Sequence, residues 1–221
     1  MSEVLSTRDV AARLHLSPRQ VQRLVAHGDL RQPVRGVLDA DSVDRYEATT
    51  RGARRRPWSP ETAWAAVALL SGVTPTSLQG SQLSRLRGRL RAISAEDLVE
   101  RARARAEVTR WLAHRSTVPR LRPDVITPAR ALGLAAVPDT GVDGYVPVDR
   151  VAGLVTAHGL VDDLGRGQVT LRATAEHPGL VRDLAERGVL GALDLATSLD
   201  PRERRVATDA LQVVLDRYRD G

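Results

Sequence analysis

Near the start of the chain, four residues within five positions have long side chains that can each form two hydrogen bonds to one partner: Arg19, Gln20, Gln22 and Arg23. Arginine binds a guanine edge and glutamine an adenine edge through two hydrogen bonds, and both also contact backbone phosphates. The residue types and their spacing therefore predict contacts with double-stranded DNA, provided that the local fold presents these side chains together.

The elements that would position them are two short helices within residues 6–30. Ser6 or Thr7 is suited to cap the first helix, and Asp9 lies where the carboxylate of a capping box belongs. The following apolar residues are spaced by three and four: Val10, Ala11 and Leu14. This pattern predicts a helix with one buried face.

A turn over residues 15–17 leads into the second helix. Ser17 is suited to cap it, Pro18 takes the first helical position, and Gly28 lies where a left-handed C-terminal cap is favoured. Its inward positions are Val21, Leu24 and Val25. The four long polar side chains therefore face outward, and Ser17 joins them as an expected DNA contact. The segment is predicted to be a helix-turn-helix.

Residues 4–48 resemble the small winged helix-turn-helix domains of the MerR and excisionase type, in which a hairpin and a third helix follow the helix pair. The resemblance implies a hairpin built from Leu30, Val34, Gly36, Val37 and Leu38, and a third helix over residues 39–47 with Val43 and Tyr46 in the core. This wing is short and carries only Arg31 and Arg35, of which Arg35 is the expected DNA contact. The alternative is a helix-turn-helix used for protein contact, or a three-helix core without a ligand.

A basic linker is expected over residues 49–57, where TTRGARRRP combines glycine, proline and four arginines. Arg54, Arg55 and Arg56 are expected to lie along the DNA backbone or in a minor groove, as flexible basic arms do. A solvated hinge is the alternative.

Composition restricts the remaining chain. All 33 basic residues are arginine, there is no cysteine, and the formal net charge is +6. The absence of cysteine excludes disulfides and thiolate chemistry, and with no signal peptide or long apolar run the expected location is the cytoplasm, without membrane insertion. Residues 1–57 and 58–122 are net basic and residues 123–221 net acidic. This division suits a nucleic-acid partner at the front and a protein partner behind.

Three helices are expected within residues 58–122, which we predict to be a basic helical domain. The first begins at Ser59 and contains Trp58 and Trp64, which the surrounding Ala, Val and Leu residues assign to the core. An arginine-rich amphipathic helix follows over residues 81–93, and a third over residues 94–115.

Residues 123–221 are expected to form a small, acidic, mixed α/β domain that binds a partner. Residues 161–174 predict a hairpin that turns at residues 165–167 and ends in a half-exposed strand, because Val169, Leu171 and Ala173 alternate with polar residues. A last helix begins at Asp200, with an apolar stripe at Val206, Ala210, Val213, Val214 and Leu215. The expected fold class is mainly α, with a winged helix-turn-helix, a central helical region and this α/β domain.

No catalytic pattern emerges. The five histidines are scattered without metal-ligand spacing, and phosphate-binding glycine motifs and a nucleophile elbow are absent. The chain is therefore expected not to be an enzyme and to hold neither cofactor nor metal.

Most of residues 54–211 resemble the AbiEi-type antitoxins, which are encoded beside AbiEii-type nucleotidyltransferase toxins. The resemblance lies in RRRPWSPETAWAAVALLSG, SQLSRLRGRLR, YVPVDRVAGLVTAHGL to GQVTLRAT, and ALDLATSLDPRERRVATDAL. It implies an autorepressor that binds its own promoter and a C-terminal region that neutralises a nucleotidyltransferase-type toxin. An excisionase-like accessory factor, in which DNA binding is architectural, and a protein-interaction module remain alternatives. A homodimer would suit two DNA half-sites.

Overall fold

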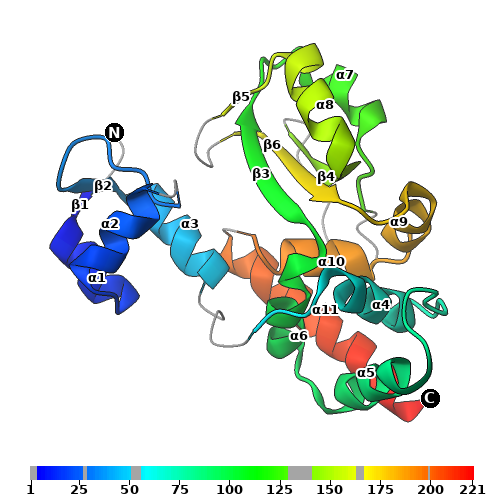
Figure 1. The fold of residues 1–221 in the computed structure, drawn as a ribbon. Helices are drawn as coiled ribbons and strands as arrows, with labels where there is room; N and C mark the ends of the chain where they lie inside the picture. Colours follow the sequence, from blue (N-terminus) through cyan, green and yellow to red (C-terminus); the bar gives the residue numbers. More distant parts are fainter. Residues whose placement is uncertain (1–3, 27–28, 51–55, 129–140, 163–166, 199) are drawn as a thin grey trace.

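The computed structural model describes residues 4–26, 29–50, 56–128, 141–162, 167–198 and 200–221 (Figure 1). Within these ranges the fold is mainly α, as the sequence predicts, with one two-stranded and one four-stranded sheet. None of the described helices combines the length and apolar character needed to cross a membrane. The expected helix cap at Gly28 and the basic residues Arg54 and Arg55 lie outside the described residues.

The predicted helix pair is present as α1 (Thr7–Leu14) and α2 (Pro18–Ala26). Ser6 caps α1, since its Oγ accepts a hydrogen bond from the Asp9 backbone N–H at 3.1 Å. His15 ends the helix in the left-handed conformation, with φ of 54°, and its N–H bonds back to the Ala12 carbonyl. The turn expected at residues 15–17 is therefore confirmed.

The expected hairpin is short: it consists of an antiparallel bridge between Val34 and Val37 and a hydrogen bond of 3.0 Å from the Asp39 N–H to the Arg31 carbonyl. The strand β2 (Val37–Asp39) pairs instead with β1 (Val4–Ser6), an antiparallel strand that we did not predict. Pro33 lacks an N–H and cannot donate to a ladder, whereas residues 4–6 supply three paired positions. The predicted hairpin is therefore confirmed in part, and the longer pairing of β2 with β1 was missed.

The third helix, α3 (Ala40–Thr50), covers this small sheet. It completes a core in which Val43 is fully buried and Tyr46 partly buried, as expected. The helix includes Thr49 and Thr50, so the expected linker begins later than residue 49. The other fully or nearly buried members of this core are Val10, Ala11, Val21, Leu30 and Leu38.

Two of the expected central helices are confirmed as α4 (Pro60–Leu70) and α5 (Gly80–Ala92). Ser59 caps α4 by accepting a hydrogen bond from the Thr62 N–H. Trp58 and Trp64 are buried in the core, and the arginines of α5 are exposed.

The third expected helix is wrong beyond its first eight residues. α6 (Ala95–Ala102) is followed by a 3-10 turn at Arg103–Arg105 and then by β3 (Glu107–Leu112). The β-branched pair Val108 and Thr109, followed by Trp111, favours a strand. The capping signal at Ser94 was correct, but it marks only where a helix begins.

The four-stranded sheet has the order β4-β6-β3-β5, with β4 (Val142–Pro147), β5 (Val161–Asp162) and β6 (Val169–Thr174). β4 and β6 are parallel, and β3 is antiparallel to both β5 and β6. The hairpin expected within residues 161–174 is wrong, because β3 lies between its two strands. β6 is also buried on both faces rather than half-exposed.

Two hydrophobic cores cover the sheet. On one face, α7 (Val118–Leu121) and α8 (Val151–His158) pack against the apolar side chains of β4 and β6. On the other, Tyr145 joins a core formed with α4, α9 (Pro178–Ala185) and α10 (Val189–Leu195). Figure 1 shows α7 and α8 near the top and α9 lower down, beside α10 and α4.

The final helix, α11 (Pro201–Asp220), packs against α4, α5, α6 and α10. Its buried residues are Ala207, Leu211, Val214 and Leu215, whereas Val206 and Val213 of the expected stripe are exposed. The expected separation at residues 122/123 is absent, because β3 from the first half is a central strand of the sheet, and α11 from the second half packs against α4, α5 and α6 of the first. The predicted helical and α/β domains therefore share the four-stranded sheet and the larger of its two cores.

Candidate functional site

The five expected DNA contacts in the helix-turn-helix are all exposed: Ser17, Arg19, Gln20, Gln22 and Arg23. Residues 19, 22 and 23 are separated by three and four positions, so they share one face of α2. The opposite side buries Val21 completely and Leu24 partly. Within the described part of the chain, the side chains of Arg19, Gln22 and Arg23 form no hydrogen bond or ion pair. The helix therefore presents two unneutralised cations and an amide together.

Gln20 makes a local contact at the start of α2 that we did not predict. Its Oε1 accepts hydrogen bonds from the Ser17 N–H and the Ser17 hydroxyl, both at 2.8 Å, while the Gln20 N–H donates to Ser17 Oγ at 3.3 Å. This reciprocal pairing is a capping box, which stabilises the first turn of α2. Ser17 and Gln20 are thus engaged with one another, and the spacing S-x-x-Q could have revealed this.

Arg13, another arginine of the helix-turn-helix, has a structural role. Arg13 of α1 pairs with Asp44 at 2.6 Å and with Glu47 at 2.7 Å, both on α3. The hydrogen bond to Glu47 is the largest cause of a raised Arg13 pKa. Arg13 therefore ties α1 to α3, whereas Arg19 and Arg23 have no such acidic neighbour among the described residues.

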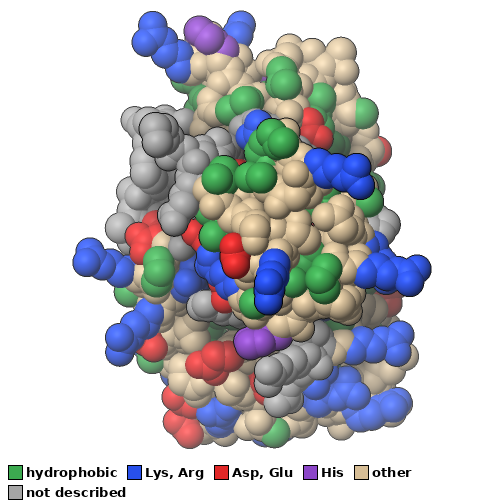
Figure 2. Space-filling model, turned by 90° about the vertical axis from the view of Figure 1, so that its left-hand side faces the viewer, with side chains coloured by type: hydrophobic (Ala, Val, Ile, Leu, Met, Phe, Trp, Pro, Cys, Tyr) green, Lys and Arg blue, Asp and Glu red, His purple; other side chains and the backbone are tan. Residues whose placement is uncertain are grey.

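The other expected DNA contacts are less well defined. Arg35 is exposed in the turn before β2, and Arg56 is exposed without helix or strand structure. Figure 2 views the molecule from the side on which α1 and α2 lie, and Arg side chains are spread around this face among acidic and hydrophobic ones. The face is therefore mixed in charge, so local pairing distinguishes the arginines better than their number does.

A buried cluster of charged residues, which we did not predict, lies between the sheet and α10. Its members are Arg105, Tyr145, Arg172 and Asp194, and all are at most 9% exposed. Asp194 Oδ1 accepts hydrogen bonds from an Arg105 guanidinium nitrogen and from the Tyr145 hydroxyl, the latter at 2.8 Å. Arg105 Nε donates to Tyr145 Oη at 2.8 Å, and Arg172 Nη1 lies 3.3 Å from the same Asp194 oxygen.

This environment shifts the proton affinities of the cluster. Burial raises the pKa of the Tyr145 hydroxyl, and the opposing effect of Arg105 does not cancel it. Burial alone would lower the pKa of Arg172, but the charges of Asp194 and Asp143 outweigh it and the net shift is upward. Both arginines thus stay protonated and Tyr145 stays neutral.

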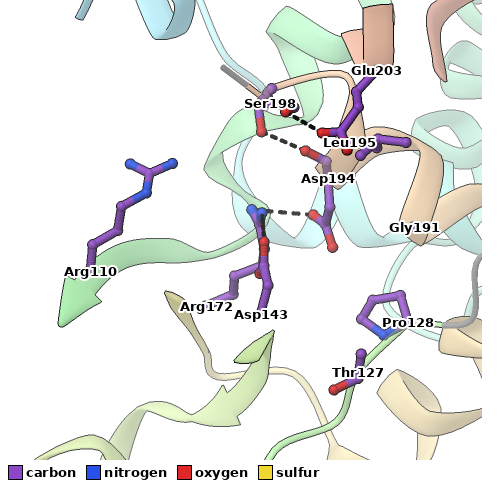
Figure 3. A pocket seen from close by; sticks show the side chains of 11 residues that line it. Arg110, Thr127, Pro128, Asp143, Arg172, Gly191, Asp194, Leu195, Ser198 and Glu203 are labelled. Atoms are coloured by element: carbon purple, nitrogen blue, oxygen red, sulfur yellow. Dashed lines mark hydrogen bonds and ion pairs between the residues drawn. The ribbon is translucent and has the colours of Figure 1, made fainter. Parts of the chain in front are cut away.

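The cluster borders a cleft of about 250 Å³ between the sheet and the α10–α11 connection. In Figure 3, Arg172 and Asp143 point toward Asp194 at its centre, and Ser198 and Glu203 lie on the α11 side. Arg172 binds Asp143 through two hydrogen bonds of 2.7 and 2.9 Å. The second oxygen of Asp194 is buried without a hydrogen-bond partner in the described part of the chain. Most of the charge in the cleft is already paired within the protein.

Sequence reasoning missed this cluster because Arg172 was assigned to an exposed strand face. One signal was available. A strand followed by a helix occurs twice, at residues 142–158 and 169–185, and this pattern is typical of parallel strands, which are usually buried on both faces. An arginine in such a strand requires a buried partner, although the sequence does not show which acid supplies it.

Comparison of the chain with protein-family models, curated proteins and solved structures yields no match. Among the residues that the structure describes, no three His, Cys, Asp or Glu side chains are grouped so as to hold a metal ion. Functional inference therefore depends on the two arrangements above, of which only the α2 surface leaves its cations unpaired.

Proposed function

We propose that the protein is a sequence-specific double-stranded DNA-binding regulator that inserts α2 into the major groove. Arg19, Gln22 and Arg23 contact bases and phosphates, Ser17 and Gln20 hold the start of the helix, and Arg35 and Arg56 approach the backbone from either side. The types of residue on α2 match the hydrogen-bonding patterns of guanine, adenine and phosphate.

One observation carries this proposal. Arg19 and Arg23 share an exposed face of a helix whose opposite side is fixed in a core, and neither has a partner among the described residues. An arginine retained for the fold is expected to resemble Arg13, which binds two carboxylates. Unpaired cations on a rigid helix suit a polyanion, because phosphate contacts release counterions and fix the orientation of the duplex.

The regulatory role extends this proposal through the resemblance to AbiEi-type antitoxins. In that form the DNA is the protein's own promoter, and the part of the chain after the linker neutralises a nucleotidyltransferase-type toxin. DNA binding by α2 does not require such a toxin, so the two parts of the proposal are tested separately.

The decisive experiment measures binding of the full chain to the DNA upstream of its own gene and to a scrambled duplex, by fluorescence anisotropy across a salt series. Arg19→Ala/Arg23→Ala should weaken specific binding by about 10- to 100-fold, since each contact to a base or phosphate contributes about 1–3 kcal/mol. The slope of log affinity against log salt should also become shallower.

Arg87→Ala/Arg89→Ala is the matched control, because it removes the same charge from exposed positions on α5. Equal losses in both double variants, or equal binding to both duplexes, would leave only general arginine attraction and would favour a protein-interaction module. The single variant Arg23→Ala refines the result. A loss on every sequence assigns Arg23 to phosphate, whereas a loss confined to one base position makes it a base contact.

A further inference from the structure

A second pocket, of about 240 Å³, lies at the carboxyl end of the parallel strands β4 and β6. Pro147, the last residue of β4, lines it, and so does Pro178, the first residue of the helix that follows β6. This pocket is separate from the α2 surface and shares no lining residue with the cleft at Asp194.

The topology of the sheet makes this location informative. The chain leaves β4 toward α8, whose Leu154 packs on the sheet face formed by Val146 and Leu171. It leaves β6 toward α9, whose Val181 belongs to the core on the opposite face, with Tyr145. Adjacent parallel strands whose connections leave to opposite faces create a crevice at their carboxyl ends, which is where open α/β sheets bind ligands.

The walls of this pocket are apolar and its rim is cationic. Ile126 and Leu154 contribute apolar surface beside the prolines. Arg150 lines the pocket from the start of α8, and Arg182 lines it from the last turn of α9. Both arginines are exposed, and neither side chain forms an ion pair or hydrogen bond with any other described residue. Asp124 is the one acidic residue in the lining, and it lies 3.3 Å from His158 Nε2.

We propose that this pocket binds a small organic anion with an apolar body. The body would lie against Ile126, Leu154 and the prolines, and its carboxylate or phosphate group would be bound by Arg150 and Arg182. Guanidinium groups form paired, charge-assisted hydrogen bonds with both kinds of anion. An apolar pocket with a few convergent polar groups is the usual form of a small-molecule site. The proposal is independent of DNA binding.

Isothermal titration calorimetry of the full chain tests this with two anions and their neutral counterparts: benzoate with benzamide, and adenosine monophosphate with adenosine. At least one anion should bind about tenfold more tightly than its neutral counterpart. Arg150→Gln/Arg182→Gln should then weaken that binding about tenfold or more, and the preferred anion distinguishes a carboxylate from a phosphate ligand.

Two controls locate the binding. Arg205→Gln removes an exposed arginine from α11, and Arg19→Ala/Arg23→Ala removes the cations of α2; both should leave the affinity unchanged. The proposal is overturned if neither anion binds better than its neutral counterpart, or if Arg150→Gln/Arg182→Gln has no effect. An affinity that falls only in the α2 variant would likewise reject it, and would assign the anion to the DNA-binding surface.

Discussion

Arg19 and Arg23 of α2 and the buried pair Arg105 and Arg172 are the same kind of residue in opposite environments. The α2 pair is exposed and has no acidic partner among the described residues. The buried pair is at most 5% exposed, and both members contact one carboxylate, that of Asp194. The same guanidinium group is thus available for a ligand in one place and used to satisfy the fold in the other.

This difference matters in a chain whose 33 basic residues are all arginine. The number of arginines in a segment then says little about function. Burial and pairing indicate the role of each arginine better than their number does. A buried guanidinium must be neutralised by an acidic group of the protein, whereas an exposed guanidinium without a partner is available to bind an anionic ligand.

The largest loss of stability is expected from a substitution in the buried charged cluster. Asp194→Ala leaves Arg105 and Arg172 buried without their shared carboxylate, and should lower the free energy of unfolding by about 3–5 kcal/mol. Urea denaturation followed by tryptophan fluorescence measures this, since Trp64 donates to the Arg105 carbonyl at 2.9 Å.

Asp183→Ala is the matched control for that substitution. Asp183 pairs with Arg187 at 2.8 Å, but both side chains are more than 40% exposed, so its loss should lower the free energy of unfolding far less than Asp194→Ala does. Similar values for the two variants would contradict the assignment of Asp194 to a buried charge network.

A smaller effect with a characteristic pH dependence is expected from Tyr145→Phe. At neutral pH it should cost about 1–3 kcal/mol, because Arg105 Nε loses its acceptor and Asp194 loses a donor. The pKa of Tyr145 is raised in the folded state, so above about pH 10 the unfolded tyrosine releases its proton while the folded one keeps it. This group therefore reduces stability as pH rises, by about 1.4 kcal/mol per pH unit.

The phenylalanine variant lacks this ionisation. The difference in free energy of unfolding between Tyr145→Phe and the unsubstituted protein should therefore become smaller as the pH is raised from 9 to 11. Tyr46 and Tyr218 are present in both proteins and cancel in the comparison. A constant difference across this range would show that Tyr145 titrates normally in the folded protein.

The smallest changes in stability are expected from substitutions on the exposed surface of α2. Gln20→Ala removes the capping box of α2 and should lower stability by about 0.5–1 kcal/mol. The Gln22 side chain bonds to no described residue. Gln22→Ala should therefore change the free energy of unfolding by less than about 0.5 kcal/mol while the affinity for DNA falls. Thermal unfolding and fluorescence anisotropy on the two variants separate these roles, and a reversed pattern would make Gln20 the DNA contact.

The α1–α2 pair was predictable because its signals are local. Ser6, the turn at His15, Ser17 and Pro18 specify where each helix begins and ends within a few residues along the chain. The exposed positions of α2 then follow from its apolar spacing. The wing was less predictable, because the partner of β2 is a strand more than 30 residues earlier.

The four-stranded sheet shows the limit of local inference. β3 has a strand-like sequence, but the helix signals at Ser94 and Ala95 precede it without a marked break, and its partner β6 lies some 60 residues further along. The alternation within β6 predicted one exposed face. A central strand covered by helices on both sides has none, and only the packing of α8 and α9 establishes that coverage.

By itself, the sequence determined the helix caps, the apolar faces of α1, α2, α4 and α5, and the identity of the side chains on α2, because these depend on propensity and spacing within one element. The tertiary structure alone decided which arginines are neutralised. Arg105, Tyr145, Arg172 and Asp194 come from four segments that span about 90 residues, and the sheet and α10 bring them within hydrogen-bonding distance. Pairing over such separations results from packing of the whole core, and no local pattern encodes it.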